Sequence, residues 1–217
     1  MSLVVVKVGG AASADAAGRV LALGEHHRVC VVHGAGPQIT AEVARRGLPL
    51  AFVRGRRVTT PEVLAVVLES LAQVNAALVE ALGPRAVAAP AGLLDATPVP
   101  ELGLVGEALP SAPELVRHAL DAGLIPVVQP VAAGPLNVNG DEAAVALALG
   151  LGADRLVFVT DVPGVLVEGE VARSLAAHEA ERLADTFDGG IVPKLLAAVR
   201  AARGGVETEI GRTAVTA

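Results

Sequence analysis

The 217-residue sequence has very little of several residue types. It contains three Phe, no Tyr, no Trp, one cysteine and two lysines. Together with a formal net charge of −6, the scarcity of aromatic side chains argues against a nucleic-acid binder, which needs basic faces and stacking platforms. The single cysteine, Cys30, excludes an intramolecular disulfide, and its place in an apolar run predicts an inert core residue.

Long apolar runs and targeting signals are also missing. Hydrophobic residues make up 53% of the chain, but they are mostly Ala, Val and Leu spread over its length, and no run approaches the roughly 20 residues that a membrane span needs. The first residues lead directly into a strand-like run and do not form a secretory signal. We therefore expect a cytoplasmic protein with no membrane contact, built as one large α/β domain or two joined lobes.

Two junctions between a strand and a glycine loop open the chain. Residues 3–8 form a β-branched run with Lys7 inside it, followed by Gly9-Gly10, which predicts a doubly buried parallel strand and a backbone free to approach a ligand. The alternative is a lysine at a strand end beside a plain turn. Residues 28–32 form a second buried strand that ends at His33-Gly34-Ala35-Gly36. Parallel strands bring both loops to one sheet edge, where backbone N–H groups can meet an anion, and we interpret His33 as a structural residue.

The next segments predict a hairpin and a long helix. Residues 48–60 carry three arginines around the turn residue Gly55; two of them can be simply solvated, and Arg57 is the one we expect to grip a substrate carboxylate. Thr60 and Pro61 begin a helix to about residue 82, in which we place Asn75 on the surface. Residues 102–106 predict a turn or an edge strand.

The organising stretch, the segment around which we expect the site to be built, is residues 136–144, Leu-Asn-Val-Asn-Gly-Asp-Glu-Ala-Ala. It follows a strand-like run and continues into an Ala-rich helical pattern, so we expect Asn137, Asn139 and Asp141 on a loop before a helix N-terminus. The only two lysines, Lys7 and Lys194, lie in unusual settings, one inside a strand and the other inside the start of a helix, where a cation opposes the helix dipole. We infer that Asp141 orients both lysines around a transferring phosphoryl group.

Six motifs in this order resemble the amino acid kinase superfamily, and most closely its acetylglutamate kinases. They are Lys7-Val8-Gly9-Gly10, His33-Gly34-Ala35-Gly36-Pro37, Gly55-Arg56-Arg57-Val58-Thr59, Asn137 to Asp141, Thr160 to Gly164 and Gly189 to Lys194. The resemblance implies an α/β fold, a three-layer αβα sandwich with an open, mostly parallel eight-stranded sheet. It also implies ATP-dependent phosphorylation of the γ-carboxylate of N-acetyl-L-glutamate in arginine synthesis.

The same resemblance implies roles for individual residues. Lys7 and Lys194 stabilise the transferring group and Asp141 holds both, while Arg57, Asn137 and the backbone of Ala35 and Gly36 bind the amino-acid substrate. The ATP-binding residues are Lys7, Gly9, Gly10, Thr160, Asp161, Val162, Pro163, Gly164, Val165, Thr186, Phe187 and Asp188, with Mg²⁺ carried by ATP and not by the protein. The resemblance further implies two lobes: residues 1–135 would bind the amino-acid substrate and form the dimer contact, and residues 136–217 would bind ATP. The protein would be a homodimer.

Departures from the family pattern leave alternatives open. Ala35 stands in place of a glycine and adds a methyl group near the substrate, residues 88–100 are shorter than the family hairpin, and the C-terminus ends early. The N-terminal helix of arginine-inhibited hexameric relatives is absent, which predicts no such feedback. The alternatives are a carrier-protein-linked aminoadipate or glutamate kinase of lysine synthesis, and a non-catalytic ligand-binding protein on the same fold. The run Asn137 to Asn139 favours acetylglutamate, and the three charged residues together favour catalysis.

Overall fold

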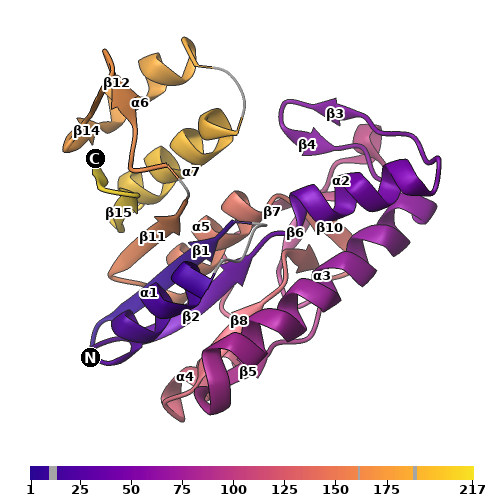
Figure 1. Ribbon diagram of the computed structural model, residues 1–217, viewed down its shortest axis with the longest axis horizontal. Helices are drawn as coiled ribbons and strands as arrows, with labels where there is room; N and C mark the ends of the chain where they lie inside the picture. Colours follow the sequence, from indigo (N-terminus) through magenta and orange to yellow (C-terminus); the bar gives the residue numbers. More distant parts are fainter. Residues whose placement is uncertain (10–13, 161, 188–189) are drawn as a thin grey trace.

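The main sheet runs through the whole molecule. The computed structural model describes residues 1–9, 14–160, 162–187 and 190–217 (Figure 1). Eight strands lie in one sheet, and six of its seven described strand pairs are parallel, with β15 and β16 forming the antiparallel pair. In spatial order they are β14 (Ser174–Ala176), β16 (Thr213–Thr216), β15 (Glu207–Ile210), β11 (Arg155–Val159), β1 (Leu3–Val8), β2 (Arg28–His33), β8 (Ile125–Val128) and β5 (Ala86–Ala88). The predicted open, mostly parallel eight-stranded sheet is confirmed.

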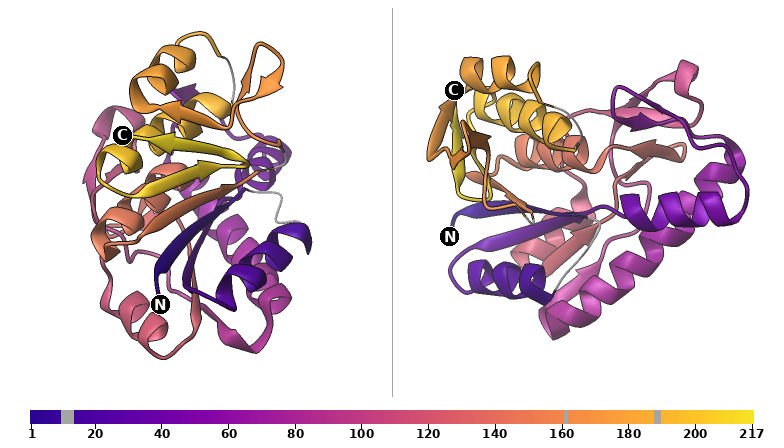
Figure 2. Two further views of the ribbon diagram at one scale, coloured as in Figure 1. Left: turned by 90° about the vertical axis from the view of Figure 1, so that its left-hand side faces the viewer. Right: turned by 45° about the horizontal axis from the view of Figure 1, so that its top comes forward.

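Helices cover both faces of this sheet. Along β1, Val4, Val6 and Val8 belong to one apolar cluster and Leu3 and Val5 to another, because successive strand side chains point to opposite faces. The first cluster is completed by α1 (Ala14–Gly24) and α3 (Pro61–Leu82), and the second by α4 (Glu114–Asp121), α5 (Gly140–Leu151), α6 (Ala177–Ala184) and α7 (Ile191–Arg203). Figure 2 shows the two groups of helices on opposite sides of the sheet. The αβα arrangement is therefore as predicted.

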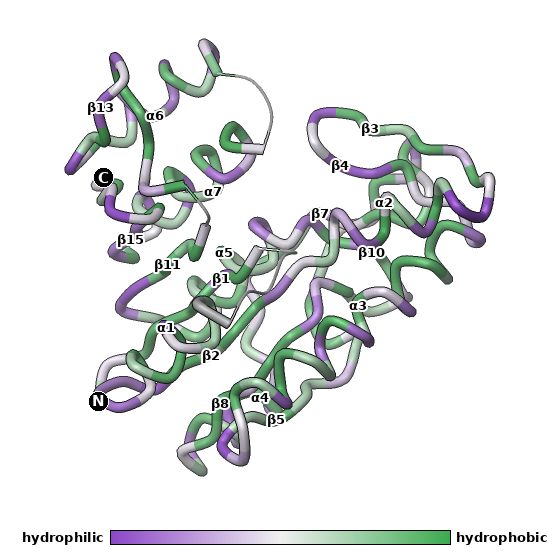
Figure 3. The backbone as a smooth tube through the Cα atoms, viewed as in Figure 1, coloured by the Kyte–Doolittle hydropathy of each residue, from purple (hydrophilic) through white to green (hydrophobic). Residues whose placement is uncertain are grey.

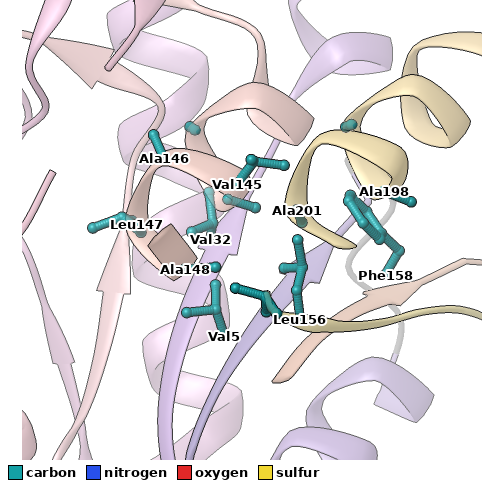
Figure 4. Close-up of a cluster of buried hydrophobic side chains, with 14 of the residues drawn as sticks. Val5, Val32, Val145, Ala146, Leu147, Ala148, Leu156, Phe158, Ala198 and Ala201 are labelled. Atoms are coloured by element: carbon teal, nitrogen blue, oxygen red, sulfur yellow. The ribbon is translucent and has the colours of Figure 1, made fainter. Parts of the chain in front are cut away.

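Small side chains bring α5 and α7 close to the sheet. Alanines of α5 and α7, among them Ala146, Ala148, Ala198 and Ala201, pack against Leu156 and other strand residues in one buried cluster (Figure 4). An alanine has no side-chain entropy to lose and lets a helix approach its neighbour closely. α5 in this way lies directly against β1 and α7, which places the first turn of each helix near the end of β1.

A second, smaller sheet lies beside the first, in the order β6 (Ala96–Pro98), β7 (Val105–Ala108), β10 (Leu136–Val138) and β9 (Val131–Ala132). The prediction of a turn or edge strand over residues 102–106 is wrong for β7, which has neighbours on both sides. Gly106 allows this, because a Cβ there would lie 2.7 Å from Ala96 Cβ and 3.2 Å from Leu136 Cβ. The remaining short elements are η1 (Gly83–Arg85), η2 (Pro100–Leu102) and the hairpins β3 (Phe52–Val53) with β4 (Arg56–Arg57) and β12 (Leu166–Val167) with β13 (Glu170–Val171).

The long helix begins and ends as predicted, with Thr60 Oγ1 accepting a hydrogen bond from the Val63 N–H. Among the described residues, the stretch Pro61–Arg85 is long and apolar enough to cross a membrane, judged by its length and mean hydropathy alone. The expectation that no apolar run approaches the length of a membrane span is therefore wrong for this stretch. Half of its most apolar window is buried inside the protein, and polar residues interrupt the helix along its length (Figure 3). Both features are typical of a core helix of a globular protein.

Candidate active site

The three charged residues singled out from the sequence lie together. Lys7 is near the end of β1, Asp141 is in the first turn of α5, and Lys194 is in the first turn of α7. Lys7 Nζ lies 2.9 Å from Asp141 Oδ1, and Lys194 Nζ lies 3.2 Å and 3.3 Å from the two carboxylate oxygens of Asp141. The side chains of all three are at most 13% exposed. One buried carboxylate therefore holds both lysines of the chain.

The two ammonium groups determine the charge state of Asp141. Burial by itself raises the pKa of this carboxyl, but the charges and hydrogen bonds of Lys7 and Lys194 more than offset that effect. The pKa of Asp141 therefore lies below its usual value, and the group stays ionised at neutral pH. An ionised carboxylate accepts hydrogen bonds from both lysines at once.

The start of α5 is built to fix the position of Asp141. Asn139 is the N-cap, and its Oδ1 accepts hydrogen bonds from the backbone N–H of Asp141 at 2.8 Å and of Glu142 at 3.3 Å. Gly140 leaves little space beside Lys7, since a Cβ there would lie 3.4 Å from Lys7 Cε. The predicted single loop over Asn137, Asn139 and Asp141 is wrong: Asn137 lies on β10, paired between β7 and β9, and only Asn139 lies between the strand and the helix.

A cavity of about 240 Å³ opens beside Lys7 and Asp141. Its polar side chains include Arg57 and Asn137, and its apolar lining comes from segments far apart in the sequence. The residues that line the cavity include Lys7, Ala35, Gly36, Phe52, Arg56, Arg57, Asn137 and Asp141. The cavity thus combines positive charge with apolar walls, as a site for a small anionic molecule requires.

Arg57 is buried in the wall of this cavity with part of its guanidinium unsatisfied. Its Nη2 donates to Thr40 Oγ1 at 2.8 Å and to the Gly36 carbonyl oxygen at 3.4 Å, and its guanidinium lies 4.6 Å from the ring centre of Phe52. Its Nη1 is buried and has no hydrogen-bond partner among the described residues. Burial lowers the pKa of Arg57. A buried cationic donor without a partner is costly, so this N–H is a natural contact for a carboxylate ligand.

A chain of hydrogen bonds connects Asn137 with Arg57. Asn137 Nδ2 donates to Thr59 Oγ1 at 3.0 Å, and Thr59 Oγ1 donates to the Arg57 carbonyl oxygen at 2.9 Å. Thr59 is fully buried. Sequence reasoning did not assign it a role, since a threonine at the end of a hairpin carries no signal of a contact 78 residues away.

The loop after β2 lies at the same edge of the sheet. Ala35 is the N-cap of α2 (Gly36–Arg45), whose first turn has no side-chain cap. Ala35 lines the cavity but is only 2% exposed, because it belongs to an apolar cluster with Val43 and Val67. Its methyl group therefore takes little of the space that we expected it to reduce.

His33 is a structural residue, as predicted. It is fully buried, and its Nε2 lies 3.0 Å from Asn75 Nδ2, which also donates to the Val127 carbonyl oxygen at 3.0 Å. Since that nitrogen is a donor, His33 Nε2 is the acceptor. Burial is the main reason why the pKa of His33 is lowered to about 4. The hydrogen bond to Gly34 raises this pKa, and the positive charge of Lys7 lowers it further. The prediction that Asn75 lies on the surface is wrong.

Of the predicted nucleotide residues that the structure describes, only Lys7 lines the cavity. Gly9 and Thr160 directly follow paired strand residues, Val8 and Val159. Val162 and Pro163 are exposed, and Gly164 packs so tightly that a Cβ would lie 2.6 Å from Thr213 Oγ1. Val165 is buried, and its backbone N–H and carbonyl oxygen are both hydrogen-bonded inside the fold. Thr186 is exposed and Phe187 is half-buried. The predicted nucleotide residues Gly10, Asp161 and Asp188 lie outside the described residues.

No group of three His, Cys, Asp or Glu side chains that could hold a metal ion occurs in the described part of the chain. The one carboxylate at the cavity that is close to both lysines, Asp141, is already occupied by two ammonium groups.

Comparisons with known proteins point to one family. The model of the amino acid kinase family matches residues 2–211. The chain is 44% identical over 202 residues to a protein of Frankia alni named acetylglutamate kinase, covering 82% of this chain and 59% of that protein. It is 41% identical over 226 residues to an acetylglutamate kinase of Rubrobacter xylanophilus, covering 97% and 88%. The chain spans less than three fifths of the length of the Frankia relatives.

Among solved structures, the chain is similar to smu.665 from Streptococcus mutans, with a TM-score of 0.90, 26% identity and 99% and 98% of the two chains covered. It is also similar to carbamate kinase from Giardia lamblia bound to AMP-PNP, with a TM-score of 0.72, 14% identity and 99% and 98% covered. At that identity the second likeness concerns the fold alone.

Proposed function

The chain belongs to the amino acid kinase family, and we propose that it transfers the γ-phosphoryl group of ATP to the γ-carboxylate of N-acetyl-L-glutamate, as an acetylglutamate kinase of arginine synthesis. The observation that carries this proposal is the buried group Lys7–Asp141–Lys194 beside a cavity with an unpaired arginine N–H. The names of the relatives support the choice of substrate.

The reaction needs charge neutralisation more than proton transfer. A γ-carboxylate is ionised at neutral pH, so one of its oxygens attacks the γ-phosphorus directly, the bond from that phosphorus to the bridging oxygen of ADP breaks, and no proton moves. The obstacle is the approach of one anion to another. Lys7 and Lys194 supply two positive charges at this point, and a buried cation acts more strongly than an exposed one because water screens it less.

Asp141 acts through the two lysines. Because it is ionised and mostly buried, it fixes both ammonium groups before substrate binds, so no reorganisation is needed during the reaction. A lysine has three N–H donors, so an ammonium group that Asp141 holds can also donate to a phosphoryl oxygen.

The cavity provides the amino-acid site in this proposal. Arg57 Nη1 and the amide of Asn137 bind the α-carboxylate region, and the backbone at Ala35 and Gly36, at the start of α2, contacts the remainder of the substrate. The unpaired N–H of Arg57 supports this role, since substrate would satisfy a donor that the protein leaves without a partner.

We assign the nucleotide to Gly9, Gly10 and the segments 160–165 and 186–188, with Mg²⁺ carried on its phosphates. Residues 1–135 would then bind the amino acid and form the dimer contact, and residues 136–217 would bind ATP. We further propose a cytoplasmic homodimer whose partners are these small molecules, without nucleic acid or membrane. Sedimentation velocity that gives a monomer mass would contradict the dimer.

The test is ATP-dependent acyl phosphate formation, trapped with hydroxylamine, on N-acetyl-L-glutamate, L-glutamate and N-acetyl-L-aminoadipate in parallel. We expect turnover of N-acetyl-L-glutamate and its loss by roughly 100-fold or more in Lys7→Ala, since one transition-state cation is removed. Turnover of another acid would change the assigned substrate and leave the proposed mechanism in place. A folded, ATP-binding protein that phosphorylates none of the three acids would refute the proposal.

A further inference from the structure

The hairpin β3–β4 reaches from one part of the site to the other. Its two-residue turn has positive φ at both central residues, 48° at Arg54 and 77° at Gly55, which is the turn type that matches the twist of a tight hairpin. Figure 1 shows this hairpin extending toward the N-terminal end of α7. At the turn, a Cβ on Gly55 would lie 3.8 Å from Pro193 Cγ, so the turn of the hairpin lies close to the residue next to Lys194.

Arg56 connects the same hairpin to α5. Its Nε and Nη2 donate to the two carboxylate oxygens of Glu142 at 2.9 Å and 3.1 Å, and Nη2 lies 3.7 Å from Glu107 Oε1. Glu142 directly follows Asp141 on α5. Arg56 was one of two arginines that the sequence allowed to be simply solvated, but its side chain is only 21% exposed.

Apart from Arg57, whose Nη2 donates to Thr40 Oγ1 and the Gly36 carbonyl oxygen of α2, the hairpin contributes few buried side chains among the described residues. Phe52 is 52% exposed and Val53 is 47% exposed, so the hairpin buries few apolar side chains, and a two-stranded hairpin of this size is marginal without further support. The paired fork of Arg56 and Glu142 is a stronger and more directional contact than a single exposed ion pair.

Arg56 also changes the charge at the cavity. Arg56 lines the cavity and is paired with Glu142 and Glu107, which do not line it; without Arg56, their carboxylates would stand unpaired near a site that has to receive an anion. Like charges in that position weaken binding, and the guanidinium cancels them.

We propose that the Arg56–Glu142 pair is a latch that positions Arg57 over the acyl-amino-acid site and keeps nearby carboxylates from repelling the substrate. The residues act on binding and not on the transferring group, so they are positioning residues. The assignment rests on the proposed function for the identity of the substrate, but the latch itself is a property of the hairpin.

The kinetic test compares Arg56→Met, Glu142→Gln and the double variant with a control, Glu209→Gln. The control breaks a partly exposed Arg155–Glu209 pair of similar length between β11 and β15, away from the cavity. We expect the KM for N-acetyl-L-glutamate to rise about five- to tenfold in both single variants, with kcat within twofold and the KM for ATP unchanged. The double variant should have a KM between those of the wild type and Arg56→Met, because it loses the fork but no longer leaves the Glu142 carboxylate to repel the substrate. Arg56→Lys should be intermediate, since it keeps the charge and loses the fork.

A second measurement does not require turnover. The chain has three phenylalanines, Phe52 on the hairpin and Phe158 and Phe187 elsewhere, so 4-fluorophenylalanine labelling gives three ¹⁹F signals that single Phe→Leu variants assign. In Glu142→Gln the Phe52 signal should broaden or shift toward its position in the urea-unfolded protein, while the Phe158 signal stays in place.

The outcomes separate the two proposals. If the wild-type protein phosphorylates no acid but the Phe52 signal responds to Glu142→Gln, the proposed function fails and the latch stands. If N-acetyl-L-glutamate is turned over and its KM is unchanged in Arg56→Met and Glu142→Gln, the positioning role is refuted, whatever the fluorine spectrum shows. An unchanged Phe52 signal refutes the latch as a structural device.

Discussion

Replacing Asp141 by asparagine separates the roles of charge and shape at the centre of the site. The substitution keeps the size of the side chain and removes the negative charge that lies 2.9 Å from Lys7 Nζ and 3.2 Å from Lys194 Nζ. Two ammonium groups that are 10% and 13% exposed then face each other without a carboxylate. Removing one partner of a buried pair costs about 3–5 kcal/mol; since water reaches both lysines in part, we expect a loss near the low end, about 3 kcal/mol.

The effect on catalysis should be larger than this loss of stability alone would cause. With the lysines no longer held, kcat for acyl phosphate formation should fall by roughly 100- to 1,000-fold. Urea unfolding gives the free energy of unfolding. The hydroxamate assay, run without urea at a temperature where both proteins are folded, gives kcat. Asp121→Asn is the control, since it removes an exposed pair with Arg28 and should change neither quantity appreciably.

The pH dependence of stability gives a further test of the same variant. The pKa of Asp141 is lowered in the folded protein, so the stability that this group contributes is present above its ordinary pKa and is lost as pH falls through the folded value. Asp141→Asn should lack this acid-dependent loss. A variant that keeps more than a third of wild-type activity and unfolds at the same urea concentration would refute the reasoning, because the lysines would then be positioned without Asp141.

Two further predictions concern buried groups near the site. Arg57→Leu should raise the KM for N-acetyl-L-glutamate roughly 10- to 100-fold, because Nη1 has no partner among the described residues and is left for the substrate. It should also lower the free energy of unfolding by about 1–2 kcal/mol, because the hydrogen bonds of Nη2 to Thr40 and Gly36 are lost; an unchanged KM would contradict the assignment. The pKa of His33 is lowered to about 4, so the unfolded chain binds a proton below about pH 6.5 that the folded protein does not, and stability should fall by about 2 kcal/mol between pH 7.5 and pH 5. Urea unfolding at both pH values measures this slope, which His33→Asn should abolish; the same slope in the variant would show that another group is responsible.

Local sequence signals were sufficient for the elements that carry the site. The β-branched run at residues 3–8 and the capping pair Thr60-Pro61 depend on neighbouring residues, and the structure has both as predicted. The setting of the two lysines was equally informative. A cation in a buried strand or at a helix N-terminus needs a negative partner, and the organising stretch offered Asp141.

The tertiary structure alone decided the other contacts between distant side chains. Asn75 is buried because His33, 42 residues away, needs a donor, and Arg56 is held by Glu142, 86 residues away. Asn137 lies on a strand because β7 and β9 provide neighbours that its own short segment does not reveal. Periodicity and capping are properties of adjacent residues, whereas such contacts depend on strand order and helix placement. The sequence therefore determined the parts of this site, and the packing of α5 and the β3–β4 hairpin determined how those parts are joined.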